Sequence, residues 1–370
     1  MVPQNTSATS SLDIQQLSST LHRSLSFSAT LDQCVPLAGD ASNRRYYRVH
    51  LSGAPVRSLI LMQLAEAEGF KASEEAVSGH EPEIFELPFI NVLNHLAVIG
   101  LPVPVLYFYD EPAGLLFLED FGDVTLAQAC QGASGDIIER LYRQAIDVLV
   151  QLHVQASVPA QIPCLAFSRS FDVPLYLWEF DHFLEYGVVA RYGQPISAKD
   201  LVPIQEEFKK IAEWLAAQSK VFTHRDFHSR NVMVDGHRLG VIDFQDALLG
   251  PVTYDLASLL RDSYIALDES LIDELLVYYR ERMCQALPSS QHAAMLLDDA
   301  EAFRQLFDYS SIQRNLKAAG RFVYIDRVKG NPSFLASIPR TLHNVRANLT
   351  KYPPLHRVLK HLSPYVPEWQ

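Results

Sequence analysis

Cysteine is scarce in this chain of 370 residues, which has four cysteines, none of them close to another in sequence. A structural zinc site needs clustered cysteine or histidine ligands, and a disulfide framework needs cysteines at short, regular spacings. Neither pattern occurs, so we expect four reduced thiols. They are Cys34, Cys130, Cys164 and Cys284.

Long apolar runs are also missing, because the stretch GLPVPVLYFY is short and is broken by two prolines. The first twenty residues are polar and lack the apolar core of a secretory signal. We therefore expect a cytoplasmic protein with no membrane partner. Residues 1–24 are expected to form a polar, partly disordered N-terminal segment.

Basic residues are fewer than acidic ones, 31 against 43, and the formal net charge is −12. Nucleic-acid binding needs basic surface to neutralise phosphates, so we expect no nucleic-acid partner. A small anionic substrate in a local basic pocket stays compatible with this charge. The length favours two domains, the composition of 48% hydrophobic residues supports a large core, and the oligomeric state is left open.

Periodicity predicts an α+β fold, with a small β-rich N-lobe at residues 25–122 and a larger, mainly helical C-lobe at 123–370. In the N-lobe we expect a strand, a polar turn around Gly39–Asn43, a strand through Tyr46–Leu51, a strand at 58–65, a helix at 81–100, and a second hairpin turning at Glu111–Gly114. In the C-lobe we expect helices at 136–156, at 202–220 with Pro203 in the first turn, and over most of 255–362. Asp235-Gly236 predicts a hairpin turn.

The stretch VFTHRDFHSRNVMV, residues 221–234, places many ionisable groups between two apolar runs. On a strand, His224, Asp226 and His228 would share one face and could hold a metal ion. An ordinary polar loop with structural histidines is a second explanation. A catalytic loop is the third.

The catalytic explanation gains support from a second segment. His224-Arg225-Asp226 is followed by Asn231 five residues after Asp226, and VIDFQDA places Asp243 twelve residues further on, after an apolar strand. Phosphoryl transfer uses these residue types: one carboxylate orients the substrate hydroxyl and accepts its proton, while an amide and a second carboxylate hold Mg²⁺. The intervening hairpin would let Asn231 and Asp243 meet at one metal ion.

HRDFHSRN followed by IDFQDALLGPVTYDLASLL resembles the aminoglycoside phosphotransferase and choline kinase group of small-molecule kinases. The resemblance implies a bilobal protein-kinase-like fold that uses ATP and Mg²⁺. It implies Asp226 as catalytic base and Asn231 and Asp243 as metal ligands. It also implies structural support of the catalytic loop, by Asp255 and, we expect, by His224 and Arg225.

Several features of protein kinases are absent from the sequence. There is no GxGxxG loop, no DFG triplet, and no lysine on the third strand, where Met62 and Gln63 stand. We expect the first hairpin to cover ATP and one basic residue there to contact its phosphates; solvated arginines are the alternative. The expected residues are Ser42, Asn43, Arg44 and Arg45. In LLFLEDFGD, the Glu119 carbonyl and the Phe121 amide are expected to bind adenine.

A closer resemblance adds GDASNRRYYRV, LEDFGDVTL and QRNLKAAGRF, and is to the bacterial anomeric kinases of N-acetylmuramate and N-acetylglucosamine. It implies an amino-sugar substrate phosphorylated at C1 during peptidoglycan recycling. Arg314, Lys317 and Arg321 share one helix face, which suits a neutral or anionic sugar better than a polycation. We expect His228, Arg314 and Arg321 to contact the substrate. A kinase of an aminoglycoside, choline or another amino alcohol, and a nucleotide-binding pseudokinase, are the alternatives.

Overall fold

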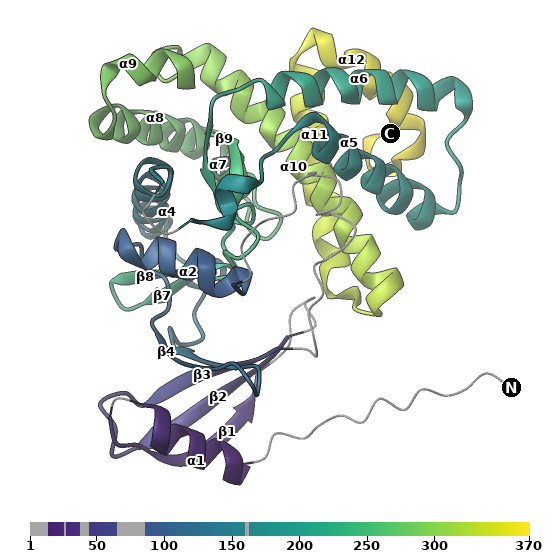
Figure 1. Ribbon diagram of the computed structural model, residues 1–370. Coiled ribbons are helices and arrows are strands. Elements are labelled where there is room, and N and C mark those ends of the chain that lie inside the picture. The colour runs from purple at the N-terminus through teal and green to yellow at the C-terminus, as the bar shows by residue number, and fades with distance from the viewer. Residues whose placement is uncertain (1–13, 26, 38–43, 65–85, 160–162) are drawn as a thin grey trace, which may run out of the picture. The chain divides into compact units, whose positions relative to one another are not determined.

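The computed structural model describes residues 14–25, 27–37, 44–64, 86–159 and 163–370 (Figure 1). They fall into two compact units. One comprises the described residues of Met1–Gly69 together with Pro104–Asp120, and the other those of Phe70–Val103 together with Phe121–Gln370. An antiparallel sheet dominates the first unit and helices dominate the second, which confirms the predicted α+β class.

The smaller unit is a five-stranded antiparallel sheet with the strand order β1-β2-β3-β5-β4. Leu17 and Leu21, one turn apart on helix α1, pack against sheet residues that include Leu59 and Phe117. Alternation along the strands directs these apolar side chains to one face. The elements are α1 (Ile14–Ser24), β1 (Thr30–Pro36), β2 (Arg45–Ser52), β3 (Ser58–Gln63), β4 (Leu106–Asp110) and β5 (Leu115–Glu119).

Polar contacts at the end of β5 join three strands. The Arg48 guanidinium donates two hydrogen bonds to Asp120, at 2.7 and 3.1 Å, and the Ser58 hydroxyl donates a third at 2.6 Å. The predicted second hairpin is confirmed, with Gly114 in the left-handed region at φ 63°. The turn predicted around Gly39–Asn43, with Ser42 and Asn43, lies outside the described residues.

Helix α2 (Pro88–Val98), expected in the N-lobe, packs within the larger unit. The His95 ring stacks on Phe222 with centroids 5.5 Å apart, and its Nε2 lies 2.8 Å from the Ala156 carbonyl oxygen. The Leu165 amide donates to the Asn91 side chain at 2.8 Å. These buried contacts assign the helix to the larger unit, although its place in the sequence predicted the N-lobe. The lobe boundary at residues 122 and 123 stays a prediction.

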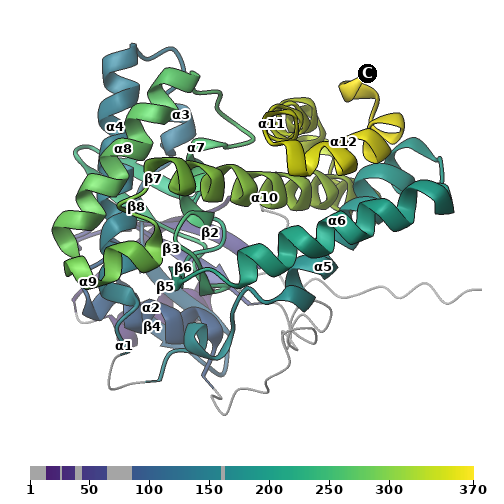
Figure 2. The same cartoon turned by 90° about the horizontal axis from the view of Figure 1, so that it is seen from above.

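The larger unit is mainly helical, and its longest described helix, α10, packs against α7 and α11 (Figure 2). It also packs against the π-helical segment η3. Among the described residues, every helix is too short or too polar to cross a bilayer. Besides α2 the helices are α3 (Leu126–Ala129), α4 (Gly135–Gln151), η1 (Leu152–Ala156), η2 (Leu165–Ser168), α5 (Val173–His182), η3 (Phe183–Ala190), α6 (Ala198–Ala216), α7 (Tyr254–Leu260), α8 (Glu269–Ala286), α9 (Ser289–His292), η4 (Ala293–Met295), α10 (Ala300–Lys329), η5 (Pro332–Ser337), α11 (Ile338–Lys351), η6 (Pro353–Leu355), α12 (His356–Leu362), η7 (Ser363–Tyr365) and η8 (Pro367–Trp369).

Pro203 lies inside α6 rather than in its first turn, so that detail of the prediction is wrong. The helix begins after Ser197, whose hydroxyl donates to Asp200 at 2.7 Å and whose carbonyl accepts the Asp200 amide. This polar pair starts the helix before the proline is reached. The missing proline N–H deprives the Lys199 carbonyl of its helical partner, and the exposed position of Lys199 lets water replace it.

Candidate active site

Two loops of the larger unit start and end on paired strands. The loop of residues 224–231 runs from β6 (Lys220–Thr223) to β7 (Val232–Asp235), and the loop 242–247 runs from β8 (Arg238–Val241) to β9 (Leu248–Pro251). Thr223 pairs with Leu248 and Val232 pairs with Val241, so the loops lie side by side. Gly236, at φ 59°, lies in the two-residue turn of the predicted β7–β8 hairpin, which is confirmed.

Two buried carboxylates hold the backbone of the first loop. Asp255 on α7 accepts the amide N–H groups of His224 and Arg225 at 2.6 and 2.9 Å, and it is fully buried. Asp262 accepts the Ser229 amide at 2.8 Å. Backbone donors buried without partners are costly, so these carboxylates fix the loop at both ends. His153 Nε2 lies 3.6 Å from Asp255, beyond hydrogen-bonding distance, while His153 Nδ1 lies 2.6 Å from the Tyr279 hydroxyl.

The alternating metal site considered for this stretch required a strand, but residues 224–231 form a loop. Arg225 has φ 79°, which is strained for a residue with a side chain and turns the chain sharply. His224 braces the two loops, because its Nε2 lies 3.0 Å from the Ile242 carbonyl oxygen and its Nδ1 accepts the Asp226 amide at 3.3 Å. These contacts favour a shaped loop over three aligned metal ligands.

The Arg225 side chain is neutralised inside the fold. It donates to Glu179 on α5 at 2.9 Å, and Gln313 on α10 donates to the other oxygen of that carboxylate at 2.6 Å. Glu179 and Gln313 are fully buried. A buried ion pair is tolerated when both charges are hydrogen-bonded, and this one ties the loop to two helices.

Asp226, the expected base, faces a lysine from a distant helix. Lys317 Nζ on α10 lies 3.4 Å from Asp226 Oδ1, and the Asp226 side chain is 36% exposed. Burial alone would raise the pKa of Asp226, but Lys317, Arg225 and Arg314 hold that pKa well below its usual range. The carboxylate is therefore ionised at neutral pH and able to accept a hydrogen bond.

We expect Lys317→Met to lower kcat by about 10- to 100-fold, the worth of one charge-assisted contact of about 1.5–3 kcal/mol. Losing the cation frees the Asp226 carboxylate to rotate away from the acceptor hydroxyl. Steady-state kinetics measures the effect, with Lys317→Arg expected to retain more activity than Lys317→Met. Lys209→Met is the matched control, because Lys209 is 62% exposed and lies 3.7 Å from Glu213. A Lys317→Met enzyme with wild-type kcat would contradict the assignment.

The residues expected to hold Mg²⁺ lie together, with amide N–H groups donating to the Asp243 carboxylate. Asn231 Nδ2 lies 3.4 Å from Asp243 Oδ2 and 3.0 Å from the Asp226 carbonyl oxygen. Gln245 donates to Asp243 Oδ1 at 2.9 Å, and Gln245 Oε1 is buried without a hydrogen-bond partner. Carboxylate and amide oxygens are the ligands Mg²⁺ prefers, so this donor set fits that ion. Asp243 itself is strained, at φ 66°.

The three residues expected to contact substrate differ in their surroundings. Arg314 is buried and donates to Ser258 at 3.0 Å, which ties α10 to α7. Burial lowers the pKa of His228 to about 4, so its imidazole is neutral at pH 7. The Arg321 guanidinium lies 5.0 Å from the centre of the Tyr324 ring. Contact of each with substrate stays a prediction.

The expected nucleotide contacts lie apart from this network in the sequence. Arg45 is exposed at the start of β2 and Arg44 is half-buried. The Glu119 side chain accepts the Val105 amide at 3.1 Å. Phe121 is buried, and its ring lies so close to Gly240 that an added Cβ would be 2.6 Å from it. The roles of these residues towards ATP stay predictions.

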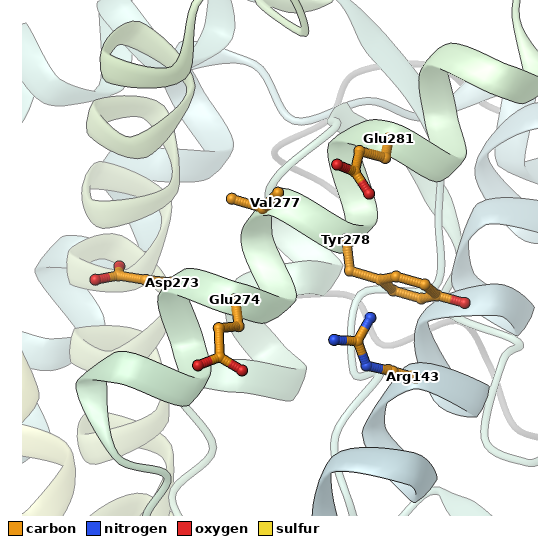
Figure 3. A pocket seen from close by; sticks show the side chains of 6 residues that line it. All are labelled: Arg143, Asp273, Glu274, Val277, Tyr278 and Glu281. Atoms are coloured by element: carbon orange, nitrogen blue, oxygen red, sulfur yellow. The ribbon is translucent and has the colours of Figure 1, made fainter.

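A surface pocket between α4 and α8 contains none of the loop residues (Figure 3). Its residues instead join the two helices: Arg143 lies 4.5 Å from the Tyr278 ring centre, and the Tyr278 hydroxyl donates to Asp147 at 3.0 Å. We therefore assign it to helix packing. The candidate active site is the loop pair with Lys317.

Sequence reasoning missed four residues of this network as site residues: Glu179, Gln245, Asp262 and Lys317. Gln245 lies inside a quoted motif and Asp262 lies two residues beyond its end, so their polar character close to the loops was the available signal. Glu179 and Lys317 contact the loop across 46 and 91 residues of sequence. No local pattern predicts such pairs.

Comparison with known proteins places these observations in context. The family model described as "Phosphotransferase enzyme family" matches residues 33–290, more than two thirds of the chain. A protein from Neisseria meningitidis serogroup B named N-acetylmuramate/N-acetylglucosamine kinase is 29% identical, with 88% of this chain and 89% of the relative aligned. A protein of the same name from Pseudomonas putida is 28% identical, over 86% of this chain and 84% of the relative.

Solved structures show the same fold. A choline kinase from Cryptosporidium parvum Iowa II aligns over 95% of this chain and 100% of its own, with a TM-score of 0.60 and 11% identity. The ADP-bound aminoglycoside phosphotransferase APH(2'')-Ib aligns over 90% of this chain and 98% of its own, with a TM-score of 0.55 and 15% identity. The chain is therefore a member of the phosphotransferase enzyme family and an ATP-dependent kinase of a small molecule.

Proposed function

We propose that this kinase transfers the γ-phosphoryl group of ATP to the anomeric C1 hydroxyl of N-acetylmuramate and N-acetylglucosamine. The relatives that bear this name, aligned over most of their length, support the choice of sugar. The structural observation that supports this proposal most is the cation beside the expected catalytic base: Lys317 Nζ lies 3.4 Å from Asp226 Oδ1. Arg314 also acts on Asp226, and cations beside the expected base suit a neutral or anionic acceptor.

The proposed reaction is a direct in-line transfer. Asp226 accepts a hydrogen bond from the C1 hydroxyl and takes its proton, while the C1 oxygen bonds to the γ-phosphorus and the bond to ADP breaks. Lys317 keeps the carboxylate aimed at the hydroxyl. Asn231 and Asp243 would hold Mg²⁺, which when bound offsets the negative charge of the phosphates. We place the reaction in the cytoplasm, as a step of peptidoglycan recycling.

Another hydroxylated substrate is the main alternative, because the fold is shared with choline kinases and aminoglycoside phosphotransferases. Such substrates are cationic, and their binding needs carboxylates or an aromatic cage free of competing cations. Lys317, 3.4 Å from Asp226, disfavours a polycation there. Asp226, Asn231 and Asp243 are all present, which disfavours a pseudokinase.

The test is an ADP-release assay with N-acetylmuramate, N-acetylglucosamine, choline and an aminoglycoside. We expect turnover with the two sugars. The product should show the ³¹P NMR signal of an acid-labile anomeric phosphate. The methyl glycoside of N-acetylglucosamine, whose C1 oxygen is blocked, is the matched control and should be inert. Turnover of choline or the aminoglycoside alone, or phosphorylation of the methyl glycoside, would overturn the proposal.

Phosphate binding by the first hairpin is tested separately. We expect Arg44→Ala or Arg45→Ala to raise the KM for ATP by about tenfold or more, because a charge-assisted phosphate contact is worth about 1.5–3 kcal/mol. Arg57→Ala, at an exposed position of the same unit, is the control. Unchanged KM and kcat in both variants would leave the two arginines as solvated surface residues.

A further inference from the structure

A row of half-buried aromatic rings lies on the larger unit, and the reaction described above does not use it. Trp178 and His182 on α5 and Tyr186 on η3 follow at four-residue intervals, and Tyr324 on α10 joins them. Ring centres are 5.3 Å apart for Trp178–His182, 4.7 Å for His182–Tyr186 and 5.1 Å for Tyr186–Tyr324. We name these four residues the aromatic row.

Two close contacts fix the row in place. A Cβ added at Gly320 would lie 2.8 Å from Phe183 Cα, so α10 and η3 touch backbone to backbone. A Cβ added at Gly187 would lie 3.4 Å from Gly320 Cα. Only glycine permits this approach, and it sets Tyr324 against His182, with ring centres 5.4 Å apart. The row is therefore a pre-formed surface.

The two helices α5 and α10, which carry three of the four rings, both contact the loop of residues 224–231. Trp178 adjoins Glu179, which binds Arg225 of the loop. On α10, Lys317 contacts Asp226, and four and seven residues further on the same helix face carries Arg321 and Tyr324. At 1.5 Å per residue these positions lie about 6 and 10 Å along the helix from Lys317.

On α5, the face opposite Trp178 carries Tyr176 and Phe180, which are both core residues. Aromatic side chains whose role is to fill the core are expected on such a buried face, not on the half-exposed one. Half-exposed rings beside a catalytic loop point to a ligand with an apolar face. The C–H face of a pyranose ring and an N-acetyl methyl group are such faces.

Arg321 selects among ligands that an aromatic surface could bind. Its guanidinium lies 5.0 Å from the Tyr324 ring centre, so it already occupies the cation position at that ring. A quaternary ammonium would meet a like charge there. A carboxylate attached to a sugar would instead meet a bidentate donor.

From this geometry we infer that the aromatic row is the sugar platform of the kinase, on which the pyranose ring stacks, with Arg321 binding the carboxylate of an acidic sugar. The inference rests on the proposed function and names its acceptor subsite. It predicts that the ring systems determine affinity for both sugars. It further predicts that Arg321 determines the preference for N-acetylmuramate over N-acetylglucosamine.

Tryptophan fluorescence gives the most direct test, since the chain has three tryptophans. Adding N-acetylglucosamine to the wild-type enzyme should change the emission, Trp178→Phe should abolish that change, and Trp214→Phe should keep it. Trp214 is the matched control because it is also half-buried and packs on Tyr309 at 4.6 Å. A sugar-dependent change that survives in Trp178→Phe would overturn the platform.

Kinetics supplies the second readout. We expect Tyr324→Ala to raise the sugar KM by tenfold or more with the ATP KM within twofold. Tyr324→Phe keeps the ring and should raise the sugar KM less than Tyr324→Ala does. Arg321→Met should raise the KM for N-acetylmuramate more than the KM for N-acetylglucosamine. If the wild-type enzyme phosphorylates the sugars but Tyr324→Ala has an unchanged sugar KM, the platform is overturned and the proposed function stands. No wild-type turnover of either sugar overturns the proposed function and the platform with it.

Discussion

Replacing Asp226 with Asn should lower kcat by about 10²- to 10⁴-fold, the usual contribution of a positioned general base. The amide keeps the shape of the side chain but cannot take the proton of the acceptor hydroxyl. ATP affinity should remain within about twofold, because Asp226 is assigned to the acceptor and not to the nucleotide. ADP release measures the first quantity and calorimetric ATP titration measures the second.

Asp235→Asn is the matched control, since Asp235 is an exposed carboxylate at the hairpin that follows the same loop. It should behave as the wild type in both measurements. Near wild-type turnover in Asp226→Asn would remove Asp226 from the chemistry. Loss of ATP binding in that variant would show that the carboxylate serves the nucleotide as well.

Asp255→Ala should be the most destabilising change in the site. The carboxylate is fully buried and accepts the backbone amides of His224 and Arg225. Two buried donors would lose their partner, at about 1–3 kcal/mol each, so the free energy of unfolding should fall by about 2–6 kcal/mol. The activity of the folded fraction should also fall, because the strained Arg225 backbone at φ 79° loses its hydrogen bond to Asp255.

Denaturant titration measures the stability of Asp255→Ala, and kinetics at a temperature where the variant is folded measures its activity. Asp255→Asn keeps one acceptor oxygen and should lie between the wild type and the alanine variant. Asp298→Ala removes a carboxylate that is 63% exposed and serves as control. Equal stability of Asp255→Ala and Asp298→Ala would show that the loop amides find other partners.

The loop pair could be predicted from the sequence because its pieces are close along the chain. Asn231 and Asp243 are joined by a short hairpin, and the left-handed Gly236 directs the chain back on itself. The order of residue types then points to phosphoryl transfer. Local patterns of this kind are set by turn chemistry and strand pairing, which act over a few residues.

The surroundings of the loop could not be predicted in the same way. Lys317 was identified as part of a basic helix face, yet nothing near it in sequence indicates that it meets Asp226, 91 residues away. Helix α2 lies among the residues predicted for the N-lobe, and packing of side chains such as His95, Asn91 and Phe89 assigns it to the larger unit. Tertiary burial, which overrides local preference, decides both cases.

The buried pair of Arg225 with Glu179 has a consequence for regulation. In kinases that are switched by covalent modification, new phosphate–arginine contacts order the catalytic machinery. Here the arginine beside the catalytic carboxylate already has its anionic partner, at 2.9 Å, made in the same polypeptide. The contacts that hold loop 224–231 are therefore made within the folded chain, and we expect the loop to need no phosphate–arginine contact to order it.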